Sequence, residues 1–179
     1  APQDAKAMFN WTEPKMPENW HGVWSTPERP GTRVVVHEAV HALQPPDRQD
    51  PSLLTAALRE GACDFVAHLA TGEPPRGPAL PFARARLAAL WPKFASRMDG
   101  ADLRGWMYGK GARGEPTDLG YAVGYLICEA YYERAEDKDA AVRRIIEETD
   151  SRAFLRDSGF AESVQGGKAS VSPPAPSAP

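Results

Sequence analysis

Proline placement constrains this chain more than any other feature, because proline is excluded from a helix interior. Its ring clashes with the preceding turn, and it has no backbone N–H to donate. Of the 18 prolines, eight lie within residues 1–51, six between 74 and 116, and four in the last seven residues. Between Lys93 and Phe160 the only proline is Pro116. Helices are therefore expected in the stretches that are poor in proline.

The spacing of apolar residues in those stretches predicts a mainly α fold. Residues 33–44 carry Val36, Val40 and Leu43 at helical spacing, with Thr32 as a candidate cap and Pro45 as a stop. Further helices are expected over residues 52–70, 82–97 with a kink at Trp91-Pro92, 118–134, 138–149 and 152–157.

Three segments follow from this pattern. Residues 1–31 form an irregular arm, rich in proline and tryptophan, that is expected to pack its aromatics on a helical body over 32–160. Residues 161–179 are expected to be a disordered tail, because they contain no aromatic residue and end in SPPAPSAP. Either an artificial boundary or cleavage of a signal peptide would produce a start at Ala1, which slightly favours a secreted or periplasmic location over a cytoplasmic one.

Composition excludes several classes of function. The formal net charge is −3, so the chain lacks the basic excess typical of a nucleic-acid binder. No apolar run approaches the roughly 18 residues that a membrane span needs. Two cysteines, Cys63 and Cys128, are too few for a disulfide scaffold or a thiolate zinc cluster and are expected to be small core residues. The chemistry must therefore come from histidines, carboxylates and hydroxyls.

The motif that carries such chemistry is HEAVH, residues 37–41. Residues four apart share one face of a helix, so His37 and His41 can both reach one metal ion. Glu38 lies beside them and can act on a water molecule as general base. A catalytic zinc site takes three protein ligands and one open position, so a third ligand must come from elsewhere.

The second expected helix supplies that ligand in the segment EGACD, residues 60–64. The chain between His41 and Glu60 is long enough for a turn and an antiparallel return, so Glu60 is the expected third ligand. Asp64, on the same face, is expected to accept a hydrogen bond from the distal nitrogen of a ligand histidine. Gly61 is expected to allow the two helices to approach closely, and Gly120 and Gly124 to do the same for another helix.

Four blocks in matching order carry a family resemblance: HEAVHALQ, LREGACDFVAHLATG, DLGYAVGYLICEAYYERAEDK and FLRDSGF. HExxH followed by a downstream glutamate is similar to the gluzincin arrangement. Together the blocks resemble one family of predicted zinc-dependent proteases that is catalogued as a domain of unknown function. The resemblance implies a zincin-like metallopeptidase domain over residues 32–160, with zinc as cofactor and a peptide or protein as substrate.

Such proteins usually have a small sheet before the HExxH helix, whereas this chain shows no clear strand alternation there. The expected fold is therefore a zincin-like helical body with a reduced or absent N-terminal β-sheet. The segment GYxxGY places Tyr121 and Tyr125 on one stripe of the 118–134 helix, and one of them is expected to stabilise the oxyanion. Two alternatives stay open: a zinc hydrolase of a non-peptide amide or ester, and a non-catalytic zincin-like binding module. The sequence predicts no oligomeric state.

Overall fold

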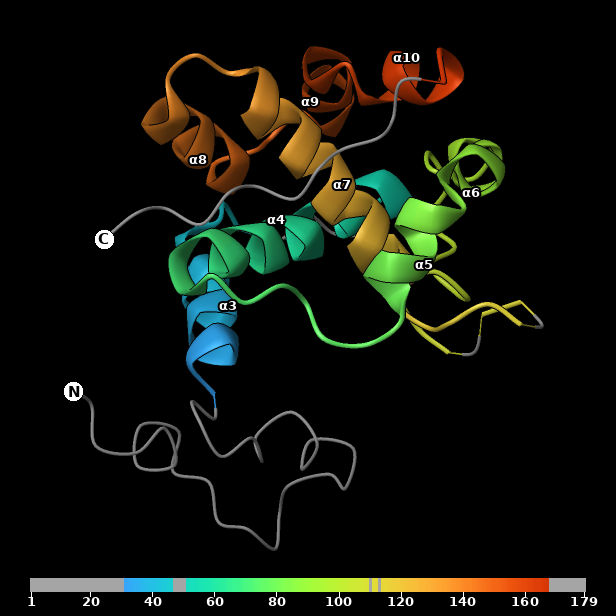
Figure 1. Cartoon of the computed structure of the whole chain (residues 1–179), viewed down its shortest axis with the longest axis horizontal. Helices are drawn as coiled ribbons and strands as arrows, with labels where there is room; N and C mark the ends of the chain where they lie inside the picture. The colour runs from blue at the N-terminus through green and yellow to red at the C-terminus, as the bar shows by residue number, and fades with distance from the viewer. Residues whose placement is uncertain (1–30, 47–50, 110, 113, 168–179) are drawn as a thin grey trace, which may run out of the picture.

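The computed structural model describes residues 31–46, 51–109, 111–112 and 114–167 (Figure 1). The expected N-terminal arm, apart from Gly31, and the end of the expected tail lie outside these residues. The helices of the described part are α3 (Thr32–Leu43), α4 (Leu53–Thr71), α5 (Ala79–Ala85), α6 (Leu87–Ala95), α7 (Leu119–Arg134), α8 (Lys138–Ile146), α9 (Ser151–Ser158) and α10 (Phe160–Gln165).

The mainly α fold is confirmed. Among the described residues the only β feature is an isolated bridge between Arg104 and Tyr108, so this part of the chain contains no sheet. Within it, every helix is also too short or too polar to cross a bilayer.

Helices α4 and α7 cross at the centre of the molecule, and their backbones touch there (Figure 1). A Cβ atom on Gly61 would overlap the backbone of Gly124 and Tyr125, and one on Gly124 would overlap the carbonyl of Ala57. The expectation for Gly124 is confirmed, whereas that for Gly120 is wrong, because a Cβ atom there would meet Trp106 and Met107 of the preceding loop and not a helix. The partner expected for Gly61 is wrong, because this glycine faces α7 and not α3. The error arose because sequence spacing shows which face of α4 carries Gly61 but not which helix covers that face.

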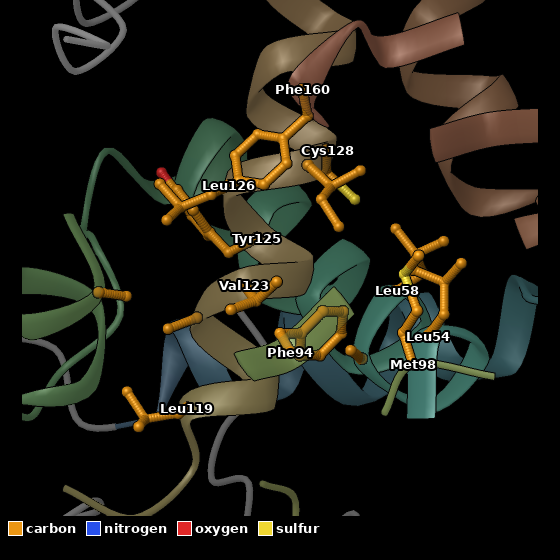
Figure 2. Close-up of a cluster of buried hydrophobic side chains, with 14 of the residues drawn as sticks. Leu54, Leu58, Phe94, Met98, Leu119, Val123, Tyr125, Leu126, Cys128 and Phe160 are labelled. Atoms are coloured by element: carbon orange, nitrogen blue, oxygen red, sulfur yellow. The ribbon is translucent and has the colours of Figure 1, made fainter. Parts of the chain in front are cut away.

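The core is built around this crossing. Figure 2 shows buried side chains from α4, α6, α7 and α10 meeting in one cluster, which includes Leu58, Phe94, Tyr125 and Phe160. Of the eleven consecutive residues of α7 from Leu119 to Glu129, all except Tyr121 are buried. This agrees with the apolar pattern expected for residues 118–134.

Helix α3 packs along α4 and buries only Val40 fully. Its N-cap is Gly31, at φ 93°, and Thr32 is already the first helical residue, so the expected Thr32 cap is wrong. Glycine adopts this left-handed backbone without steric cost. At the other end Gln44 adopts an extended backbone before Pro45, and the helix ends as expected.

Two other expectations are corrected. The helix expected over 82–97 is two helices, because Arg86 leaves the helical conformation with φ −124°, whereas Pro92 stays inside α6 and removes only one helical hydrogen bond. The tail does not begin at Ala161: α10 continues to Gln165, and its Val164 is buried against the core. Burial of Phe160 and Val164 holds this short helix on the body.

The glycine contact gives a first prediction. Gly124→Ala should lower the free energy of unfolding by about 3 kcal/mol, because the added methyl must push α4 and α7 apart. The matched control is Gly100→Ala, whose Cβ would lie 3.4 Å from the Arg97 carbonyl oxygen and needs no backbone shift. Urea denaturation with a chelator present measures both. Equal stability of the two variants would contradict the contact.

Candidate metal centre

The two histidines of HEAVH lie together on the side of α3 that faces α4. Their ring centroids are 4.9 Å apart, in an edge-to-face arrangement. Both side chains are largely buried, with 15% of His37 and 22% of His41 exposed. One turn of helix separates them, and this alone brings both imidazoles to one point.

Glu60 reaches the same point from α4. Its Oε2 lies 3.4 Å from Nε2 of His37 and 3.2 Å from Nε2 of His41. Helix α4 returns alongside α3, so Glu60 meets the two rings although it is 19 residues beyond His41. The structure therefore brings together the three side chains expected to ligate zinc.

These distances test whether the three donors fit one ion. Ligand atoms bound to a tetrahedral zinc at roughly 2.0–2.1 Å lie about 3.4 Å from one another. The two nitrogen-to-oxygen distances match that value. Two neutral imidazoles and one carboxylate also form a donor set that zinc favours, with a fourth position left for water or substrate.

The same atoms form ion pairs with one another. Burial of His37 opposes its protonation, but hydrogen bonds to Asp64 and Glu60 outweigh burial and raise its pKa to about 9. The hydrogen bond to Glu60 likewise raises the pKa of His41. Burial acts against ionisation of Glu60, but both histidines together lower its pKa to about 2.

Asp64 lies behind His37. Its Oδ1 is 3.0 Å from Nδ1 of His37 and also accepts a hydrogen bond from Arg33 at 2.7 Å. A ring that donates through Nδ1 is left with Nε2 for a metal, and Nε2 is the atom that faces Glu60. The geometry is the one expected for Asp64, and Arg33 adds a cation that holds the carboxylate in place.

The sequence analysis missed the neighbours of His41. Nδ1 of this ring lies 2.9 Å from Oε1 of Gln44 and 3.3 Å from Sγ of Cys63. An amide three residues after a histidine is common in helices, so no pattern singled out Gln44. Arg33 was missed for a similar reason, because a lone arginine before an apolar run usually faces solvent.

Cys63 raises the question of a different third ligand, since it lies with His37 and His41 within 4.8 Å. Its sulfur is on the Nδ1 edge of His41, away from the Nε2 atoms that converge on Glu60. Burial and then the charges of Glu60 and Asp64 raise the pKa of the thiol, which disfavours the thiolate that zinc requires. The donor chemistry therefore favours Glu60.

A cavity of about 540 Å³ opens beside these residues. Glu38 is exposed at this cavity and has no hydrogen bond or ion pair with any other residue in the described part of the chain. The polar and aromatic residues lining the cavity include Arg33, His37, Glu38, Asp64, Tyr121 and Tyr125.

The two tyrosines differ in their surroundings. The Tyr125 side chain is fully buried, and its hydroxyl lies 2.6 Å from Nδ1 of His68. Tyr121 is partly exposed, and its hydroxyl has no hydrogen-bond partner among the described residues. Burial, followed by the charge of Glu60, raises the pKa of Tyr121, so its hydroxyl is protonated and lies within the field of the metal-site carboxylate.

In a comparison with protein families, a family model matches residues 31–149 and therefore more than half of the chain. The matched family is DUF2268, described as a predicted Zn-dependent protease. The chain belongs to this family. A search of curated proteins and a search of solved structures each found no match.

Membership in this family identifies zinc as the cofactor and makes the chain, in broad terms, a zinc-dependent hydrolase. The matched range contains α3 and α4, and with them every side chain described above as facing the two histidines.

Asp64 gives the second prediction. Asp64→Ala should weaken zinc binding about 10- to 100-fold, because His37 loses the acceptor that orients its ring. Competition with a chromophoric chelator measures the dissociation constant. Asp102→Ala is the matched control, since Asp102 forms its ion pairs with Arg97 and Arg104, which are both exposed and belong to the described part of the chain. Unchanged affinity in Asp64→Ala would contradict this role.

Proposed function

We propose that this chain is a zinc metallopeptidase with His37, His41 and Glu60 as zinc ligands and Glu38 as general base. The observation that supports this most strongly is the meeting of two imidazole Nε2 atoms with one carboxylate oxygen at 3.4 and 3.2 Å. The exposed Glu38 lines the adjacent cavity together with His37, which gives the site access to a substrate.

Zinc held by these three side chains would make a water molecule more acidic and would polarise the substrate carbonyl. Glu38 accepts the proton of the attacking water and then gives it to the leaving amine. An exposed carboxylate with no described partner is free to approach both groups. Asp64 keeps the His37 ring in the orientation that directs Nε2 at Glu60.

The oxyanion that develops on the substrate needs a further hydrogen-bond donor. Tyr121 fits this role better than Tyr125, because its hydroxyl has no partner among the described residues and it lines the cavity. The Tyr125 hydroxyl instead donates a hydrogen bond to His68. Burial lowers the pKa of His68, so its ring is neutral and can accept this bond. We therefore assign Tyr121 to the oxyanion and Tyr125 to the packing of α7 on α4.

A second candidate function is the hydrolysis of a non-peptide amide or ester. The described residues contain no strand that could pair with a peptide backbone, which favours substrates that do not need such pairing. Digestion of a peptide library, followed by mass spectrometry, separates the two candidates when it is run beside a panel of small amides and esters. New peptide termini would establish the metallopeptidase, and turnover confined to the small panel would replace it with the second candidate.

The general base gives the third prediction. Glu38→Gln should lower kcat by about 10²- to 10⁴-fold, because an amide cannot accept the proton, while zinc stays near one ion per chain. Metal analysis and a peptide-cleavage assay measure the two quantities. His37→Ala is the comparison variant, and it should lose the zinc itself. Hydrolysis that persists in Glu38→Gln would refute the assigned base.

The tyrosines give the fourth prediction. Tyr121→Phe should lower kcat about 10²- to 10³-fold and leave zinc content and thermal stability unchanged. Tyr125→Phe should instead lower stability by about 1–3 kcal/mol, because it leaves the His68 ring nitrogen without its partner. The assignment fails if Tyr125→Phe loses kcat at wild-type stability while Tyr121→Phe keeps it.

A further inference from the structure

Gln44 occupies the point where α3 ends. Pro45 cannot follow a residue in helical conformation without a clash, and Gln44 accordingly has φ −69° and ψ 150°. Its backbone N–H still donates to the Val40 carbonyl, at 3.1 Å. The proline thus turns the chain away from the helix axis one residue after Leu43, and the Gln44 side chain lies next to His41, one turn back.

The orientation of the Gln44 amide follows from its second contact. Its Nε2 donates to the backbone carbonyl of Arg59, on α4, at 2.8 Å. A carbonyl oxygen can only accept, so the NH₂ group must face Arg59 and Oε1 must face the other way. Oε1 lies 2.9 Å from Nδ1 of His41. The proton of that hydrogen bond is therefore on Nδ1 of the histidine.

The Arg59 side chain makes a second contact with the turn at Gln44 and Pro45. Its guanidinium donates to the carbonyl of Pro45 at 2.9 Å. The residues on both sides of the Gln44–Pro45 bond are thereby tied to one residue of α4. Because Glu60 follows Arg59 directly, the turn that holds Gln44 is fixed relative to the carboxylate that faces both histidines.

His37 and His41 are consequently held in the same way by different residues. Asp64 faces Nδ1 of His37 at 3.0 Å, and Gln44 faces Nδ1 of His41 at 2.9 Å. Each ring directs its Nε2 at the same Glu60 oxygen. Cys63 also approaches Nδ1 of His41, at 3.3 Å, but a thiol sulfur is a weak acceptor and does not replace an amide oxygen.

We propose that Gln44 is a positioning residue that holds His41 with its proton on Nδ1 and so presents Nε2 to zinc. The proposal rests on the zinc ligand set proposed above. It extends that set by a residue on the far side of His41, which acts on the metal only through this ring.

The test compares zinc affinity in two Gln44 variants. Gln44→Met keeps the length of the side chain and removes the strong acceptor, and it should weaken zinc binding about 10- to 100-fold. Gln44→Glu also loses the N–H group that donates to the Arg59 carbonyl, but it keeps an oxygen that accepts a hydrogen bond from Nδ1 of His41. Its zinc affinity should therefore lie within a few-fold of the wild-type value. Leu43→Ala is the matched control, because Leu43 is 66% exposed at the preceding position.

The visible absorption spectrum of the cobalt-substituted proteins is a second measurement. A purely structural role for Gln44 would leave this spectrum unchanged. Gln44→Met should change the visible bands of bound Co²⁺, while Gln44→Glu keeps them. Wild-type affinity in Gln44→Met would overturn the proposal. So would equal losses in both variants, since the contact with Arg59 and not the acceptor would then be the cause.

The wild-type protein provides a measurement that does not depend on how the variants fold. In ¹⁵N-labelled, zinc-loaded protein, the long-range imidazole spectrum should show His41 with a protonated Nδ1 and a metal-bound Nε2. Coordination through Nδ1 would overturn the proposal. Absence of zinc from the wild-type protein would instead refute the proposed ligand set, so the two failures are distinguishable.

Discussion

The backbone contact between α4 and α7 is the constraint on which the rest of the structure depends. Gly61 and Gly124 remove the side chains that would hold the helices apart. The residues next to them, Glu60 on α4 and Tyr125 on α7, are therefore fixed relative to each other by backbone packing. Helix α4 packs against two other helices. One of its sides is buried against α7, and the other presents Glu60 and Asp64 to α3. A larger residue at either glycine would shift α4 and with it Glu60, because the same helix forms both contacts.

Protonation controls the ion pairs between His37 and Glu60. His37 has a pKa of about 9 in place of 6.5, so the stability that it contributes is complete below pH 6.5 and is lost as the pH rises through 9. Glu60 has a pKa of about 2 in place of 4.5, so its contribution is complete above pH 4.5 and is lost as the pH falls through 2. If His37 ligates zinc as proposed above, its imidazole would have to be neutral, so binding of the metal would compete with this proton at neutral pH.

Features set by local sequence could be predicted, and features set by long-range packing could not. Proline placement and apolar spacing identified α3, α4 and α7, since both act within one or two turns. The pairing of Glu60 with the two histidines was also predictable, because only one nearby helix carries a carboxylate on a suitable face. The partner of Gly61 was not, because the same glycine could face either of two helices. The contact between Tyr125 and His68 joins residues 57 positions apart, and neither has a local pattern that points to the other.

Gln44 illustrates the boundary between the two kinds of feature. Pro45 predicts the end of α3 from sequence alone, and this also predicts that Gln44 leaves the helix. That its amide faces His41 depends on the carbonyl of Arg59, which only the packing of α3 against α4 brings within reach.

The cavity beside His37 and Glu38 is also lined by the connector between α4 and α5. Residues Pro75 and Arg76, in the connector between α4 and α5, line it together with Ala79 and Leu80 at the start of α5. Three prolines within residues 74–78 keep this connector out of a helix, and α5 begins directly after Pro78. The proline pattern that marks the ends of the helices therefore also shapes the side of the cavity that faces His37 and Glu38.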